Sequence, residues 1–200
     1  MHISDGIISL EAAAVTAAAS FLFCAYTLKQ MPLHKSTQIS IFSALFFIAS
    51  FIHIPLGPTQ VHLTLVGFIA IFLGKFSVLA IAIALLFQAL LLGFGGLSSL
   101  GANIFIIGFA SYATYLIFKF TFLKNLNAKL NYFLVGVIGV LISSFFLFLV
   151  LVLSSQNYLK VASLAMLANV PIAILEGFVT LFLFLYLEKA YPEIVKESRV

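Results

Sequence analysis

The sequence has very little charge. Asp, Glu, Lys and Arg make up 8% of its 200 residues, whereas 64% are hydrophobic and the mean hydropathy is +1.24. A soluble globular domain carries roughly 25% charged and 45–50% apolar residues. So few charged groups cannot cover a surface that faces water, which excludes a soluble domain and makes lipid the expected solvent. The pI of about 9.2 is therefore interpreted as cations flanking a membrane, not as a nucleic-acid surface.

Motifs that would indicate an enzyme are also missing. The single cysteine, Cys24, has no partner, which excludes an intrachain disulfide. There is no H-E-x-x-H motif and no nucleophile paired with a base. The segment from Gly67 to Lys75 is not a P-loop, because six residues separate its glycines instead of four and Phe76 replaces the Ser or Thr. We expect no enzyme activity, and in particular no ATP hydrolysis by this chain.

The apolar runs predict transmembrane helices. Their residues do not alternate between apolar and polar, as the strands of a membrane barrel would. A spanning helix needs about 20 apolar residues. The sequence predicts an all-α, polytopic membrane helix bundle that forms one domain, 1–200, with no linker, repeat or secretory signal peptide. The seven predicted spans are 8–28, 37–54, 62–74, 76–92, 103–123, 130–153 and 164–187, and the short third one is expected either to extend into the 55–61 loop or to be partly buried by its neighbours.

The basic residues are sorted to one side of the predicted membrane. Loops on the cytoplasmic side carry an excess of Lys and Arg. With the N-terminus outside, nine of the ten basic residues fall inside and only Lys160 falls outside. This asymmetry predicts an outer N-terminus and an inner C-terminus, in the inner (cytoplasmic) membrane. The nine residues on the inner side are Lys29, Lys35, Lys75, Lys119, Lys124, Lys129, Lys189, Lys196 and Arg199.

Three of the four histidines fall on the outer side of this topology. His34 lies in an inner loop beside Lys35 and is expected to be an ordinary solvated residue. His2, His53 and His62 are predicted to lie outside, with the glycine-rich loop from Gly93 to Asn103. Three histidines that converge with a flexible loop on one face indicate a cation site. The alternative for His62 is a helix-end residue that bonds a neighbouring backbone group.

The position of His2 adds a specific metal chemistry. A free α-amine at Met1, the next amide nitrogen and the His2 imidazole can close adjacent chelate rings on one ion. A second imidazole would complete a square-planar set of four nitrogens, a geometry typical of Cu(II) or Ni(II). The amide must lose its proton to bind, so affinity is expected to rise with pH. Alone, however, a histidine at position 2 is more often a solvated terminal residue.

Five ordered motifs resemble those of the CbiM/NikM family. Met1-His2-Ile3-Ser4-Asp5-Gly6 is similar to the family's MHI-x-DG start, and Pro55 to His62 is similar to its P-x-GPT-x-VH motif. The stretches from Gln88 to Gly96 and from Leu100 to Asn103 resemble QALLFGxGG and LGAN, and Val170 to Gly177 resembles the late P-x-x-x-x-EG segment. The resemblance runs from Met1 to about Pro192, which is nearly the whole chain.

The resemblance implies a function and a ligand set. The family consists of substrate-binding subunits of cobalt and nickel energy-coupling-factor transporters. It implies that Ni²⁺ or Co²⁺ binds to the amine of Met1, the amide and imidazole of His2, and the imidazole of His62. The transported metal is the only ligand expected, with no separate cofactor. The implied partners are a transmembrane coupling subunit, cytoplasmic ATPase subunits and a small accessory membrane subunit. The sequence does not decide between nickel and cobalt.

Other polar residues are candidates for supporting roles. Asp5 and Asn103 could accept the free N–H of an imidazole ligand, although Asp5 could also be an acid at a helix N-terminus. His53 departs from the family pattern; a structural role is favoured over that of an entry ligand. Gln88 and Glu176 lie within spans and are expected to face the bundle interior. Glu176 is too deep for an outer ligand, and a buried hydrogen bond between helices is predicted for it.

The main alternative function is a self-sufficient metal-cation permease or channel. Such a protein needs polar groups through the depth of the membrane, and the predicted inner half offers almost none. The sequence therefore favours a capturing subunit that depends on ATPase partners.

Overall fold

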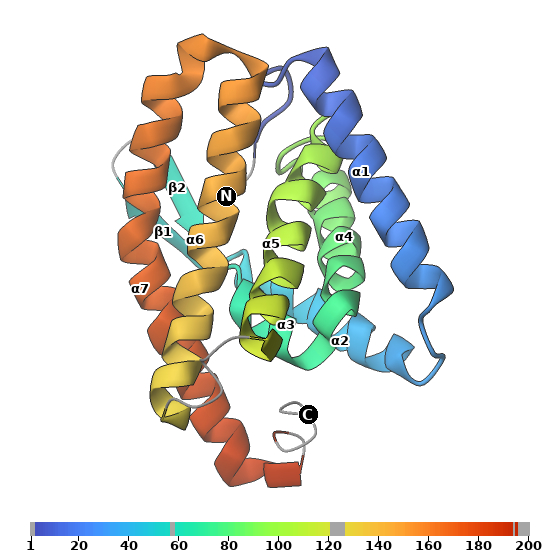
Figure 1. The fold of residues 1–200 in the computed structure, drawn as a ribbon, viewed down its shortest axis with the longest axis vertical. Helices are drawn as coiled ribbons and strands as arrows, with labels where there is room; N and C mark the ends of the chain where they lie inside the picture. Colours follow the sequence, from blue (N-terminus) through green and yellow to red (C-terminus); the bar gives the residue numbers. More distant parts are fainter. Residues whose placement is uncertain (1–2, 57–58, 121–126, 194, 196–200) are drawn as a thin grey trace.

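The computed structural model describes residues 3–56, 59–120, 127–193 and 195, and most of them are helical (Figure 1). Two short strands pair antiparallel as a hairpin. The elements in chain order are α1 (Leu10–Lys29), α2 (Lys35–Ala49), β1 (His53–Leu56), β2 (Thr59–His62), α3 (Val66–Leu73), η1 (Gly74–Phe76), α4 (Ser77–Phe87), η2 (Gln88–Leu92), α5 (Leu100–Phe120), α6 (Ala128–Ser154), η4 (Gln156–Tyr158) and α7 (Leu159–Ala190).

The helical membrane bundle is confirmed, but the count of seven spans is not. Five helical segments in the described part of the chain are long and apolar enough to cross a membrane: 10–29, 66–92, 100–120, 128–154 and 156–190. By length and composition the predicted third and fourth spans count together as 66–92, but η1 separates α3 from α4, and the two helices run in opposite directions (Figure 1). Helix α3 is buried along almost its whole length, which confirms the second of the two explanations for its short predicted span.

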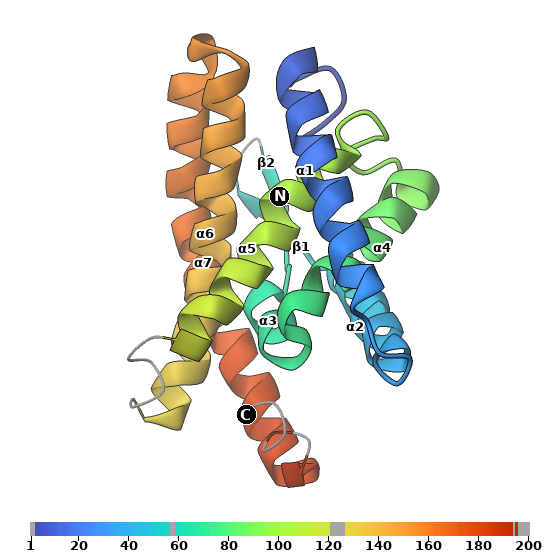
Figure 2. The ribbon, with the colours of Figure 1, turned by 45° about the vertical axis from the view of Figure 1, so that its right-hand side comes forward.

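The predicted second span does not reach the far end of the bundle. Helix α2 has 15 residues and is about 22 Å long at 1.5 Å per residue, which is short of a hydrocarbon core of about 30 Å. It rises from the lower end to mid-height, where the hairpin follows, and α3 then leads back down (Figures 1 and 2). The prediction of a helical span that begins at residue 62 is wrong at this boundary. Instead His62 ends β2, and α3 begins four residues later.

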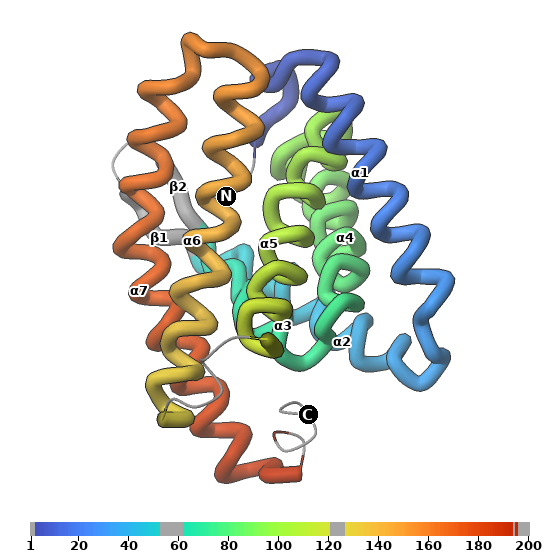
Figure 3. The backbone as a smooth tube through the Cα atoms, in the orientation of Figure 1, coloured from blue at the N-terminus to red at the C-terminus, as the bar shows by residue number. Residues whose placement is uncertain are grey.

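The described basic residues other than Lys160 still lie at one end of the bundle after this correction. Helix α2 begins and helix α3 ends at the same end of the bundle, and the two helices stand in place of the predicted second and third spans. The other helices therefore keep their predicted directions (Figure 3). The ends of α1, α5 and α7 and the starts of α2 and α6 share the lower end, and α7 begins at the upper end (Figure 1). Lys160 is therefore at the upper end. Lys124, Lys196 and Arg199 lie outside the described residues. The basic residues at the lower end are Lys29, Lys35, Lys75, Lys119, Lys129 and Lys189.

Glycines let three helices meet near the hairpin. A Cβ on Gly67 of α3 would lie 2.3 Å from the carbonyl oxygen of Val135 in α6. A Cβ on Gly136 of α6 would lie 2.6 Å from the carbonyl oxygen of Glu176 in α7. Small residues allow such close approach of helix backbones in lipid. The crossing brings Glu176 beside the start of α3.

Candidate metal site

The chain just after His2 is held inside the bundle by α5. The backbone N–H of Ile3 donates to Oδ1 of Asn103 at 2.8 Å, and the Ile3 carbonyl accepts from Nδ2 of Asn103 at 3.1 Å. The hydroxyl of Ser99 also donates to that carbonyl, at 2.8 Å. Ile3 is 3% exposed. Both polar backbone groups of a buried residue are thus satisfied by the first turn of α5 and the residue before it, which fixes the chain at this point.

Asp5 ties the same segment to the glycine-rich loop. Its carboxylate accepts from the Ser98 hydroxyl at 2.6 Å and from the Ser99 backbone N–H at 3.1 Å. The hydrogen bond from Ser98 holds the pKa of Asp5 below its ordinary value. Gly96 adopts a φ of +82°, and any Cβ there would overlap the Asp5 carboxylate. The alternative of a helix N-terminal acid is wrong, because α1 begins at Leu10 and is capped by Ser9.

His62 is buried at the end of β2. It is 3% exposed, and the edge of its ring meets Phe46, with ring centroids 6.5 Å apart. Its Nδ1 lies 2.9 Å from the carbonyl oxygen of Leu63. A carbonyl only accepts, so Nδ1 carries the proton in this contact, and in a neutral imidazole the lone pair is then on Nε2. That tautomer is the one in which Nε2 can bind a metal while a backbone group orients the ring.

The hairpin register pairs the two histidines of this region. His53 of β1 is the direct partner of His62 of β2, and the ladder continues with the Leu63 N–H donating to the Ile52 carbonyl at 3.3 Å. The position of the His53 backbone opposite a predicted ligand was not foreseen. The sequence signal for it was present, since two short runs flank Gly57-Pro58, a dipeptide typical of turns.

Glu176 fixes the turn that follows His62. Its carboxyl accepts from the backbone N–H and the hydroxyl of Thr64, the latter at 2.9 Å, and from the Leu65 N–H at 3.0 Å. Leu65 has a φ of +50°, a left-handed conformation that costs about 1–3 kcal/mol for a residue other than glycine. The predicted buried hydrogen bond is confirmed, but its partner is this turn instead of a helix. Glu176 therefore acts on the position of His62.

One face of α5 carries both anchored segments. Asn103 binds Ile3, and Ser111 donates to the carbonyl of Val66 at 3.4 Å. These two α5 residues are eight positions apart, which is about 12 Å along a helix. The residue that follows His2 and the helix that follows His62 thus pack against the same stretch of α5. Sequence reasoning missed Ser99, Ser111 and Thr64, whose hydroxyls have no motif of their own.

The remaining predicted residues contribute less to this geometry. Met1 and His2 lie outside the described residues, so the four-nitrogen set stays a prediction. Within the part of the chain that the structure describes, no three His, Cys, Asp or Glu side chains gather as metal ligands. His34 is exposed at the start of α2, at the lysine-rich end. Gln88 is fully buried, as expected. Neither Nε2 nor Oε1 of its side-chain amide has a hydrogen-bond partner among the described residues.

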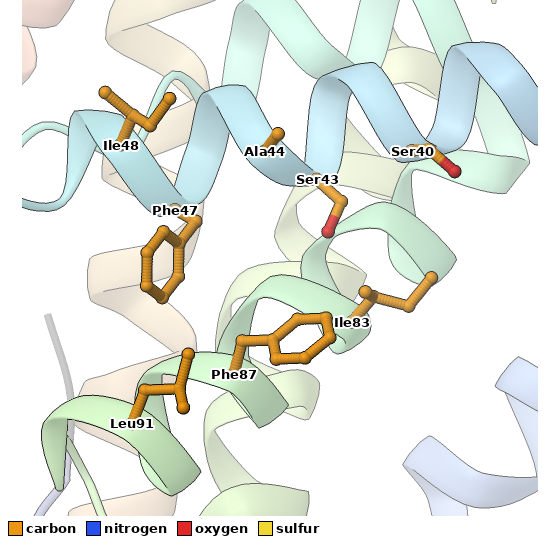
Figure 4. Close-up of a pocket in the computed structure, with 8 residues that line it drawn as sticks. All are labelled: Ser40, Ser43, Ala44, Phe47, Ile48, Ile83, Phe87 and Leu91. Atoms are coloured by element: carbon orange, nitrogen blue, oxygen red, sulfur yellow. The ribbon is translucent and has the colours of Figure 1, made fainter.

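A groove of about 340 Å³ between α2 and α4 is a poor alternative site (Figure 4). Its walls are apolar except for two serine hydroxyls, and no imidazole, thiol or carboxylate faces it. Transition metals require such ligands. The lining residues are Ser40, Ser43, Ala44, Phe47, Ile48, Ile83, Phe87 and Leu91.

Comparison with known proteins gives consistent matches along the chain. A family model described as the cobalt uptake substrate-specific transmembrane region matches residues 2–194. The cobalt transport protein CbiM of Desulforamulus reducens is 31% identical, over 100% of this chain and 87% of that protein. CbiM of Thermosipho melanesiensis is 35% identical, over 77% of this chain and 69% of its own length. A crystal structure of a transition metal transporter superposes with a TM-score of 0.83 at 28% identity, covering 96% of this chain and 95% of the other.

Proposed function

Because the chain belongs to the CbiM family of cobalt uptake transmembrane proteins, we propose that it captures Ni²⁺ or Co²⁺ and serves as the substrate-binding subunit of an ATP-driven energy-coupling-factor transporter. It is a multi-pass membrane protein of a metal transport family. The proposed location is the inner (cytoplasmic) membrane. The proposed partners are a transmembrane coupling subunit, cytoplasmic ATPase subunits and a small accessory membrane subunit.

The observation that carries the proposal is that α5 and α7 anchor the segments that follow His2 and His62. Asn103 holds Ile3, the residue after His2, and Glu176 and Ser111 hold the turn and helix after His62. The proposed ligands are the amine of Met1, the amide and imidazole of His2, and Nε2 of His62. Four nitrogens in a plane suit Ni(II), and the deprotonated amide makes affinity rise with pH. Asp5, Asn103 and His53 are proposed to support these ligands without binding the ion.

Dependence on ATPase partners distinguishes the proposed subunit from a self-sufficient permease. Cells that express this chain together with the coupling and ATPase subunits should accumulate Ni²⁺ or Co²⁺. Cells in which the ATPase subunits carry an inactive nucleotide site should accumulate the metal at background level, because this chain has no P-loop. Uptake of radiolabelled Ni²⁺ or Co²⁺ measures the accumulation in both kinds of cells. Equal uptake in the two strains would establish a permease and overturn the proposal.

The proposed orientation places the lysine-rich end in the cytoplasm. In a Cys24→Ala background, a cysteine added at the C-terminus or at His34 should resist a membrane-impermeant maleimide in intact cells. A cysteine at Lys160, which is exposed at the opposite end, should react. The cause is the preference of basic residues for the cytoplasmic side. The reverse labelling pattern would show that the N-terminus is inside.

A further inference from the structure

A second pocket lies at the lysine-rich end of the bundle, away from the candidate metal site. It has a volume of about 400 Å³ and forms where η1 meets the last turns of α5. Its lining combines lysines with tyrosines and apolar side chains: Leu73, Gly74, Lys75, Phe76, Tyr112, Tyr115, Leu116, Lys119 and Phe120. The metal site does not use any of these residues.

Two ammonium groups at this pocket have only neutral partners. Lys75 is half-buried; its Nζ donates to the side-chain carbonyl of Gln30 and lies 5.3 Å from the centroid of the Phe76 ring. Nζ of Lys119 donates to the hydroxyl of Tyr115 at 3.1 Å. No carboxylate in the described part of the chain pairs with either lysine. Lys119 is exposed, but Lys75 is partly buried, and a partly buried cation without a counter-ion is unfavourable, so this pocket is electrostatically suited to an anion.

The rest of the lining is apolar and aromatic. Leu73, Phe76 and Leu116 form part of the wall, and Phe120 is 76% exposed at the end of α5. The rings of Tyr112 and Tyr115 stack with centroids 6.3 Å apart. Tyrosines and lysines together are typical of the membrane interface, where one end of a side chain is in hydrocarbon and the other is wet. A small soluble anion would gain nothing from the apolar wall.

We infer that this pocket binds the headgroup of an anionic phospholipid, with the phosphate between Lys75 and Lys119 and an acyl chain along Leu116 and Phe120. Basic pockets at the cytoplasmic face of membrane proteins recognise such headgroups. The apolar wall and the 76% exposed ring of Phe120 favour a lipid over a soluble phosphate or an acidic protein.

The absence of tryptophan makes the test direct. Phe120→Trp places a single fluorescent reporter at the pocket, and brominated lipids quench tryptophan on contact. In vesicles of phosphatidylcholine containing 20 mol% phosphatidylglycerol, brominated phosphatidylglycerol should quench this reporter more strongly than brominated phosphatidylcholine at the same fraction. The double variant Lys75→Gln/Lys119→Gln should lower the relative affinity for phosphatidylglycerol by roughly fivefold for each lysine.

Matched controls separate a site from general charge. Leu28→Trp, 58% exposed in the last turn of α1 at the same end, should show no preference between the two lipids. Lys35→Gln/Lys129→Gln removes the same charge elsewhere at that end and should leave the lipid preference of the Phe120→Trp reporter intact. An equal loss in both double variants, or no loss in Lys75→Gln/Lys119→Gln, would overturn the inference.

Two further measurements distinguish a lipid from a soluble anion. Displacement of phosphatidylglycerol by millimolar inorganic phosphate would identify a soluble-anion site and would also overturn the inference. Native mass spectrometry of the unmodified protein, without the tryptophan reporter, should show co-purified phosphatidylglycerol. The Lys75→Gln/Lys119→Gln variant should lack this lipid.

Discussion

Adding one residue ahead of Met1 should reduce Ni²⁺ or Co²⁺ affinity by orders of magnitude while the helices stay intact. The proposed chelate uses the free amine of Met1, and an added residue moves that amine out of the ring-closing position. The chain cannot restore it by sliding, because Asn103 and Ser99 engage the N–H and carbonyl of buried Ile3. Loss of chelation costs several kcal/mol, and each 1.4 kcal/mol is about tenfold in affinity.

Calorimetric metal titration of the extended and native proteins measures this loss, with circular dichroism to confirm folding. Met1→Leu at unchanged length should bind nearly normally, because the side chain of residue 1 is not a proposed ligand. Acetylation of the amine should be as damaging as the extension, since it removes the lone pair. Equal affinities of the extended and native forms would show that the terminal amine is not a ligand.

His62→Ala should abolish high-affinity metal binding. The change removes the proposed fourth nitrogen, whose ring is oriented by the Leu63 carbonyl and held in a buried position. We expect a loss on the order of a thousandfold or more, because several kcal/mol of coordination disappear. Equilibrium titration with Ni(II) and with Co(II) measures it and also decides which ion binds more tightly.

Two further variants test whether His62 acts as a ligand or only supports the fold. His34→Ala should have no effect, because His34 is exposed just before α2, at the lysine-rich end, whereas His62 is buried at the end of β2. Thr64→Val keeps the imidazole but removes the hydroxyl that donates to Glu176, and should weaken binding by roughly tenfold, as loss of an orienting contact does. Wild-type affinity in folded His62→Ala protein would refute the ligand role.

The sequence by itself determined that the protein is a helical membrane protein and which of its helix ends lie together on the lysine-rich side. Scarce charge and uninterrupted apolar runs leave helices in lipid as the solution, because every backbone group must be satisfied within its own segment. The lysines at helix ends predicted which ends lie together, and the helix termini confirm this for the described residues. The motifs around Met1, His62 and Asn103 are sufficient to indicate the family. These properties depend on composition and local order, which a single chain displays directly.

Only the tertiary structure decided how the segments after His2 and His62 are held. The run 37–54 was apolar enough to be predicted as a span, yet α2 ends at Ala49, at mid-height, and a two-stranded hairpin follows it (Figure 1). Hydropathy cannot distinguish lipid from a protein interior, since both are apolar. Likewise Glu176 is 112 positions from Thr64, and Asn103 is 100 from Ile3. Such pairs form because a buried polar group requires a partner, and which partner it meets depends on how the glycine-lined helices cross.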